Sequence, residues 1–435
     1  MKQFFYIFAL LLFSACSNHI IDDEPENIDS DEVKTISVMS HLPKSAGGVD
    51  TYADDAESGD NSQSSGASDN IIIDKFEEGS LLYISQMGPS INPNFSDFST
   101  DAESYCYVYQ YSENPSANWN YDYNFILPEN DDFEIPGVVG EGSSGVRNPI
   151  KWNVIKQMGS VGNSFNFYAF FFPVENEVRW SVEEDQRGPE TNRYDQTNFR
   201  KSDILGAYHT TSSLYSRLRF NLFHLMVYLK VTLYVPDVQD VADDTSNFKY
   251  SGFDETALQG AYVLNAAKDF EIEWRASRSS DTDPPLTQAK SNKTNIRMYL
   301  HEPDYKVFEL ENIKSSFNPS YQGEDTEQVR EYNFSVLFPN QSFNGNFLCF
   351  ALKDKEGNMR YFYFASNQIN GSSGNYGFAP GTLQELKLFL PRETNQTILI
   401  SANVLPWSSA VTDMTVSQQG ATDKNDDNPT GSDNN

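Results

Sequence analysis

The sequence predicts an all-β protein built from two tandem β-sandwich domains. Short runs with a period of two predict strands, Gly, Pro, Asn and Asp separate these runs, and no stretch has the spacing of a long amphipathic helix. The 24 Tyr and 31 Phe residues agree with this class, because aromatic side chains favour strands. A chain of 435 residues is long enough for two domains with their own cores, together with terminal tails.

The strand assignment rests on runs in which every second residue is apolar or aromatic. Such alternation occurs over residues 105–111 and again over residues 165–171. The longest run spans 223–235, and a shorter run over 218–222 precedes it in the opposite phase. Because a slip of one residue exchanges the two faces of a strand, a bulge or tight bend is expected near Leu222-Phe223. Further runs follow at 347–352, 361–364, 386–390 and 398–404.

Composition divides the chain into segments. We expect an N-terminal β-sandwich domain over residues 33–205 and a C-terminal β-sandwich domain over residues 206–418, which meet near residues 200–210. Residues 51–70 are small, polar and acidic, so they predict a flexible insertion within the first domain. Residues 419–435 have the same character and predict a disordered tail.

The first residues are typical of a secretory signal of the lipoprotein kind. A lysine precedes an apolar run over residues 4–13, and two small residues then precede Cys16. The run is far shorter than the roughly 20 residues that a membrane-spanning helix needs. We therefore expect a lipoprotein signal peptide over residues 1–15 and lipidation of Cys16, although Phe13 stands where the usual motif has Leu. The alternative is an ordinary signal peptide that happens to end near a cysteine.

The segment 16–32 predicts an acidic tether. An acidic cluster directly after a lipidated cysteine resembles the export signal of surface lipoproteins in certain gut and oral anaerobes. A solvated tether is the simpler interpretation of a charge run, and the two interpretations are compatible. The acidic residues are Asp22, Asp23, Glu24, Glu26, Asp29, Asp31 and Glu32.

The net charge of −31 excludes some classes of partner. Nucleic acid and anionic lipid head groups both require a basic surface, so we expect neither as a ligand. The chain has three cysteines, and with Cys16 assigned to lipid, Cys106 and Cys349 remain. These two either pair or are buried unpaired thiols, and we favour unpaired thiols.

No catalytic or metal-binding pattern is present in the sequence. The five histidines lack metal-ligand spacing, and neither HExxH nor a GxSxG nucleophile elbow occurs. Residues 140–145 match GxGxxG, but Arg147-Asn148-Pro149 follows where a nucleotide site needs a helix. His224 lies within a strand pattern and is interpreted as a hydrogen-bonded sheet histidine. We therefore expect no enzyme, no metal and no cofactor.

The second half of the chain resembles the fimbrillin family. The resemblance covers residues 200–410 well, and the N-terminal half only loosely at residues 76–80. Each motif is degenerate, so the resemblance depends on the order and spacing of the motifs together with the lipoprotein signal. The motifs are Asp203-Ile204-Leu205, Leu218 to Val235 with Leu222-Phe223-His224-Leu225-Met226 inside it, Glu255 to Leu264, Val336 to Phe350, Phe378 to Thr382, Leu386-Lys387-Leu388 and Val404 to Trp407.

The resemblance implies a transthyretin-like strand arrangement in both sandwiches. It also implies a surface-exposed lipoprotein of the cell outer membrane that serves as a structural, anchor or accessory subunit of a type V pilus in cell adhesion. The implied partners are other fimbrial subunits, the outer membrane through the lipid anchor, and surface ligands on host or bacterial cells.

Assembly in this family proceeds by strand addition, in which a protease removes an N-terminal strand and the C-terminal strand of another subunit fills the groove. The candidate first strand is Thr35, Ile36, Ser37 and Val38, and the candidate donor strand is Met414, Thr415 and Val416. Cleavage in the family commonly follows an early arginine, but the first arginine here is Arg147. Lys34 and Lys44 are the only Lys or Arg residues between Cys16 and Lys75. Proteolytic processing is therefore in doubt, and an anchor or accessory subunit is as plausible as a stalk subunit.

A glycan-binding surface lipoprotein is the alternative function. The tyrosines of residues 105–111 and the aromatic residues of 119–123 have the chemistry to stack on sugar rings. Aromatic stripes of this kind more often pack on a sheet or on a neighbouring subunit, so packing is the simpler interpretation.

Overall fold

The computed structural model describes the parts of the chain that form the two sheet systems and the segments joining them. No helix among the described residues is long and apolar enough to cross a membrane. The described residues are 37–41, 44–45, 76, 79–87, 105–111, 123–126, 164–173, 178–211, 217–236, 253, 256–273, 284–301, 307–309, 328–354, 357–370, 375–391 and 394–409.

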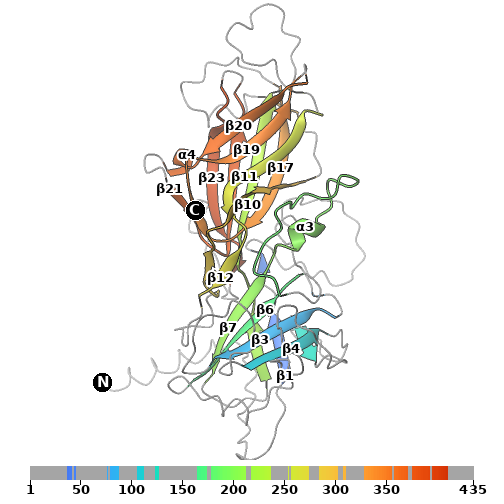
Figure 1. The fold of residues 1–435 in the computed structure, drawn as a ribbon, viewed down its shortest axis with the longest axis vertical. Coiled ribbons are helices and arrows are strands. Elements are labelled where there is room, and N and C mark those ends of the chain that lie inside the picture. Colours follow the sequence, from blue (N-terminus) through green and yellow to red (C-terminus); the bar gives the residue numbers. More distant parts are fainter. Residues whose placement is uncertain are drawn as a thin grey trace, which may run out of the picture.

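An eight-stranded sheet forms one end of the molecule (Figure 1). Its strand order is β8-β1-β5-β4-β3-β6-β7-β9. β8 and β9 stand at opposite ends of this order although only Leu222 separates them in the chain. Two residues span at most about 7 Å, so the sheet must curl back on itself. Its strands are β1 (Ser37–His41), β3 (Leu81–Met87), β4 (Tyr105–Tyr111), β5 (Tyr123–Ile126), β6 (Phe165–Phe171), β7 (Leu205–Thr211), β8 (Arg217–Asn221) and β9 (Phe223–His224).

Two sheets pack on one another at the other end of the molecule (Figure 1). A six-stranded sheet has the order β15-β17-β10-β22-β23, with β16 also paired to β17, and a four-stranded sheet has the order β14-β11-β19-β20. Phe334 of β17 and Phe350 of β19 are both buried, and their ring centroids are 5.8 Å apart. This contact joins the two sheets into a β-sandwich.

The longest of the described strands, β10, β11 and β17, belong to this sandwich. The six-stranded sheet contains β10 (Val227–Pro236), β15 (Tyr299–Leu300), β16 (Val307–Glu309), β17 (Gln328–Phe338), β22 (Thr382–Phe389) and β23 (Ile398–Pro406). The four-stranded sheet contains β11 (Leu258–Ala267), β14 (Lys293–Arg297), β19 (Asn346–Lys353) and β20 (Met359–Ala365). Shorter elements are β2 (Lys44–Ser45), β12 (Phe270–Ile272), β13 (Thr287–Ala289), β18 (Gln341–Asn344), β21 (Asn375–Phe378), β24 (Ser408–Ser409), α3 (Thr197–Arg200) and α4 (Asn367–Asn370).

The segment between β6 and α3 connects the two ends through its side chains. The Trp180 ring makes edge contacts with Phe170 and Phe172, each at 5.0 Å, and with Phe270 of β12 at 5.7 Å. The fully buried Gln186 side chain donates to the Leu337 carbonyl at 2.6 Å and accepts from the Leu337 amide at 2.8 Å. Gln186 thus satisfies both backbone groups of a residue in β17, as a neighbouring strand would.

The structure confirms the predicted all-β, sandwich-type fold and corrects one strand. The run 223–235 is not a single strand, because it breaks at Leu225-Met226 between β9 and β10. The Leu225 amide donates to the Ile204 carbonyl at 3.0 Å, and the Met226 carbonyl accepts from the Gly381 amide at 3.0 Å. These two hydrogen bonds fix the position where the chain leaves the eight-stranded sheet and enters the six-stranded sheet. The expected bend at Leu222-Phe223 is confirmed, because β8 ends at Asn221 and β9 begins at Phe223.

The change of sheet falls later in the chain than the expected meeting of the domains. β7 begins at residue 205, and β8 and β9 follow it in the chain. All three strands nevertheless pair within the eight-stranded sheet. The division into domains 33–205 and 206–418 stays a prediction. The expected signal peptide 1–15, tether 16–32, insertion 51–70 and tail 419–435 lie outside the described residues.

The sequence left open whether Cys349 is paired, and the structure shows a buried free thiol in β19. Burial raises the pKa of the Cys349 thiol to about 11. The preference for unpaired thiols is therefore confirmed at Cys349. The side chain of Cys106 lies outside the described set.

We predict that Cys349 reacts with thiol reagents only after unfolding. In a chain that starts at Ser17 and carries Cys106→Ala, a colorimetric thiol assay at pH 8 should detect the thiol in denaturant and almost none without it. Because the pKa is raised in the folded state, the Cys349 contribution to stability is present below about pH 8.5, the pKa of a free thiol, and falls as the pH rises toward 11. Rapid labelling of the folded protein would contradict this account.

Candidate strand-exchange site

β1 is an internal strand of the eight-stranded sheet, although it comes first in the chain. It pairs antiparallel with β5, where Val38 lies opposite Phe125, and parallel with β8, where Met39 lies opposite Arg219. The other pairings in this sheet are antiparallel. Without β1, the backbone edges of β5 and β8 would both lose their hydrogen-bonding neighbour, and the sheet would open at this place.

Two side chains of β8, the strand beside β1, belong to the core. Leu218 and Phe220 have no exposed surface, and the His209 ring contacts the Phe220 ring with its centroid 5.8 Å away. In the register of the parallel pair, Val38 lies opposite Leu218 and Ser40 lies opposite Phe220. Burying side chains of this size stabilises a fold by about 1.5–3 kcal/mol each. An empty β1 position would therefore be an apolar groove that favours a replacement strand.

The structure places only part of the predicted first strand. Ser37 and Val38 are the first two residues of β1, which continues to His41. Thr35 and Ile36 lie outside the described residues. The described strand extends three residues beyond Val38, and its role as an exchangeable strand stays a prediction.

The chain after β1 meets the C-terminal end of the described chain. In the two-stranded pairing of β2 with β24, Lys44 lies opposite Ser409 and Ser45 lies opposite Ser408. The predicted donor residues Met414, Thr415 and Val416 follow β24 within a few positions but lie outside the described residues. The pairing was not predicted, because the dipeptides Lys44-Ser45 and Ser408-Ser409 carry no strand signal.

A buried Asp–His–Trp cluster anchors the same C-terminal segment. The Asp203 carboxylate and His224 Nδ1 are 2.7 Å apart, and the His224 ring stacks on the Trp407 ring with centroids 3.7 Å apart and planes at 7°. Asp203 has no exposed surface, and the exposed fractions of His224 and Trp407 are 4% and 1%. The Trp407 amide also donates to the carbonyl of Gly381, whose φ of +65° favours glycine. The cluster therefore joins Trp407, the residue after β23, to the segment in which the chain passes from the eight-stranded sheet to the six-stranded sheet.

This cluster confirms the interpretation of His224 and adds partners that the sequence did not indicate. His224 is a hydrogen-bonded sheet histidine, and its burial under an indole ring favours a structural role. Asp203 lies 21 residues before it in the sequence, and Trp407 lies in a different part of the chain. All three residues stand in motifs of the family resemblance, but degenerate motifs do not show which residues meet.

The tyrosine stripe of β4 packs inside the protein where it is described. Tyr109 is 2% exposed, and the Tyr111 ring is 5.9 Å from the Phe76 ring. The predicted preference for packing over sugar stacking is confirmed for Tyr109. Within the described residues, no group of His, Cys, Asp and Glu has the arrangement of a metal site.

Comparisons with known proteins give remote structural similarity. No family model and no curated protein matches this chain. A candidate cell adhesion protein from Bacteroides ovatus is 11% identical with a TM-score of 0.41, over 86% of this chain and 98% of that chain. A fimbrial assembly protein from Parabacteroides distasonis is 10% identical with a TM-score of 0.33, over 86% and 99%. The tip fimbrial protein Mfa3 from Porphyromonas gingivalis, truncated at its C-terminus, is 7% identical with a TM-score of 0.30, over 76% and 95%. Values this low do not establish a family for this chain.

We predict that Trp407→Ala destabilises the protein by about 3–5 kcal/mol, because it leaves a large cavity beside His224. Val404→Ala in the same strand is the matched control, since the Val404 side chain is 55% exposed, and it should change stability by less than about 0.5 kcal/mol. The free energy of unfolding of both variants is measured by denaturant titration followed by far-ultraviolet circular dichroism, which reports the backbone and not the removed indole. Equal stability of the two variants would show that the cluster does not anchor the C-terminal segment.

Proposed function

We propose that this chain is a fimbrillin-like surface lipoprotein that serves as an anchor or accessory subunit of a type V pilus and assembles by strand addition. The observation that carries the proposal is the place of β1 between β5 and β8. A strand at an internal position can be replaced by a partner strand only if it first leaves. The fate of β1 therefore decides whether the subunit can accept a partner strand.

The chain has few places where a protease could release β1. A trypsin-like cut after Lys34 would remove the lipid anchor but leave β1 attached to the fold. A cut after Lys44 or Lys75 would separate β1 from the rest, and Lys44 is paired with Ser409 in the β2–β24 ladder. Because paired backbone is a poor protease substrate, retention of β1 is favoured.

A subunit that retains β1 can join a fibre through only one of its two strand-exchange positions. With β1 in place the groove is filled, so the subunit does not accept a strand. It can still donate its C-terminal segment, with Met414, Thr415 and Val416 as the inserting residues, to a neighbour. A subunit that donates but does not accept ends a fibre, which fits a position at the fibre base with the acylated Cys16 in the outer membrane.

We predict that a disulfide that locks β1 to β8 leaves incorporation into fibres intact. Met39→Cys with Arg219→Cys places thiols on paired positions of neighbouring strands. Strands about 4.8 Å apart meet the Cα separation of about 4.4–6.8 Å that a disulfide requires. Immunoblots of fibres sheared from oxidised and reduced cells should show equal amounts, with the single variants as controls. Loss of incorporation in the oxidised double variant would instead show that the subunit accepts a strand and belongs to the stalk.

We predict the opposite result for the donor segment. Replacing Met414, Thr415 and Val416 by Ser should abolish incorporation, because the inserting side chains that would fill a partner's groove are lost. Replacing Asn425, Asp426 and Asp427 by Ser is the control of equal length in the predicted tail. Incorporation by the donor variant at the wild-type level would refute the donor role of this segment.

We predict that Cys16→Ser releases the protein from the membrane fraction. The thioether-linked lipid is the expected attachment, and no helix among the described residues spans a membrane. Fractionation of cells grown with labelled fatty acid measures both location and acylation. A variant that stays membrane-bound, together with a wild-type protein that takes up no label, would contradict the lipoprotein assignment.

A further inference from the structure

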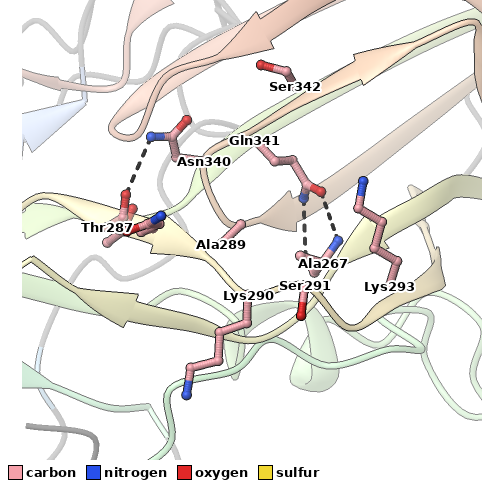
Figure 2. A pocket seen from close by; sticks show the side chains of 10 residues that line it. Ala267, Thr287, Ala289, Lys290, Ser291, Lys293, Asn340, Gln341 and Ser342 are labelled. Atoms are coloured by element: carbon pink, nitrogen blue, oxygen red, sulfur yellow. Dashed lines mark hydrogen bonds between the residues drawn. The ribbon is translucent and has the colours of Figure 1, made fainter. Parts of the chain in front are cut away.

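Glutamine side chains bond the backbone at places where strands of the C-terminal sheets lose a neighbour. Gln186 bonds both the amide and the carbonyl of Leu337, a residue of β17 that lies beyond its pairing with β15. Gln341 does the same for Ala267 at the end of β11, at 2.8 Å and 3.2 Å, where the pairing with β19 has ended (Figure 2). Because an unpaired strand edge is a template for another strand, these side chains protect two such places from other chains.

The outermost strand β23 has such a cap at its beginning only. It pairs with β22 and stands last in the strand order of its sheet. The Gln368 side chain donates to the Thr397 carbonyl at 2.9 Å and accepts from the Leu399 amide at 3.2 Å, so this amide is not free for another strand. The register against β22 then shifts at Ile400, and a bulge of this kind also protects an edge.

The second half of β23 has neither the cap nor the bulge. Residues 401–405 pair in regular register with residues 383–387 of β22, and no strand in the described part of the chain pairs with their other edge. Residues 402–405 are exposed, with 55% of Val404 and 39% of Leu405 accessible. β23 contains no Lys, Arg, Asp or Glu, although charged residues are a usual protection of an exposed edge. This half of the strand is therefore open to pairing.

We propose that the open half of β23 pairs antiparallel with the same segment of a second copy of the chain, which joins two six-stranded sheets into one. A two-fold axis through Asn403 places this residue opposite its own copy. Ala402 then faces Val404, so that a small side chain meets a larger one. Ser401 faces Leu405 in the same way. The segment is thus complementary to itself in size, and it offers a foreign strand no charge to recognise.

The acidic character of the chain does not prevent this pairing. Two copies with a net charge of −31 repel each other, but the segments that meet are uncharged. The acidic residue of β22 is Glu385, which lies opposite Asn403. In the joined sheet the two Glu385 residues are three strand spacings apart, about 14 Å, which exceeds the Debye length of about 8 Å at physiological salt. The inference does not rest on strand addition through β1.

Cysteine crosslinking tests the register. In the chain that starts at Ser17 and carries Cys106→Ala, Asn403→Cys should form an intermolecular disulfide on mild oxidation, because opposed Cα atoms in an antiparallel pair are about 4.5–5.5 Å apart. Ser401→Cys and Leu405→Cys should each crosslink poorly alone, since each thiol is then about 13 Å along the strand from its own copy. A mixture of these two variants should crosslink efficiently, which non-reducing gels measure.

Sedimentation equilibrium tests the pairing without cysteines. The mature chain should show a monomer–dimer equilibrium that strengthens as salt is raised, because salt screens the repulsion between two acidic molecules. Asn403→Glu places two carboxylates opposite one another and should weaken dimerisation by about fivefold. Asn403→Gln is the matched control and should dimerise like the wild type. Since Asn403 is exposed, neither variant should change the unfolding midpoint.

Several results would overturn the proposal. One is a wild-type chain that stays monomeric up to its solubility limit. Another is crosslinking of Ser401→Cys alone at the level of the mixture. A dimer that survives Asn403→Glu but is lost when Met414, Thr415 and Val416 are replaced by Ser would assign the contact to the C-terminal segment instead. These measurements involve neither fibres nor the release of β1, so their failure leaves the strand-addition proposal to its own tests.

Discussion

The pairing of β1 with both β5 and β8 is the constraint on which the first half of the structure depends. β8 and β9 are consecutive in the chain but lie at opposite ends of the strand order, so the sheet is curled. β1 fills the one position where a segment from the N-terminus enters that curled sheet, beside the buried Leu218 and Phe220. A sheet built in this way is complete only while a strand occupies this position. In the proposed assembly by strand addition, the occupant of this position need not belong to the same chain.

The C-terminal end is tied to the same part of the molecule by different chemistry. Trp407 stacks on His224, and His224 pairs with Asp203 at the place where the chain passes from one sheet system to the other. The β2–β24 ladder then brings the chain after Trp407 beside the chain after β1. Release of β1 and extension of the C-terminal segment would therefore disturb neighbouring backbone. This arrangement gives a structural reason for a subunit in which one of the two events is suppressed.

The all-β class and the strands β10, β19, β20, β22 and β23 follow directly from the period of two, because alternation sets which face is buried. The run 223–235 shows the limit of this signal. Its alternation continues through Leu225-Met226, yet the hydrogen bonds of these two residues to Ile204 and Gly381 divide the run between two sheets. The Asp203–His224–Trp407 cluster also escaped prediction. It is formed by residues far apart in the sequence, and a single sequence does not show which of its polar side chains will meet.

The most direct test of the account is the mature N-terminus of the protein on intact cells, determined by mass spectrometry of surface material. We expect a dominant form that begins at an acylated Cys16 and retains β1. A dominant form that begins after Lys44 or Lys75, with no acylated Cys16, would mean that β1 has left and that the groove accepts a partner strand. That result would contradict the anchor or accessory assignment and identify a polymerising stalk subunit.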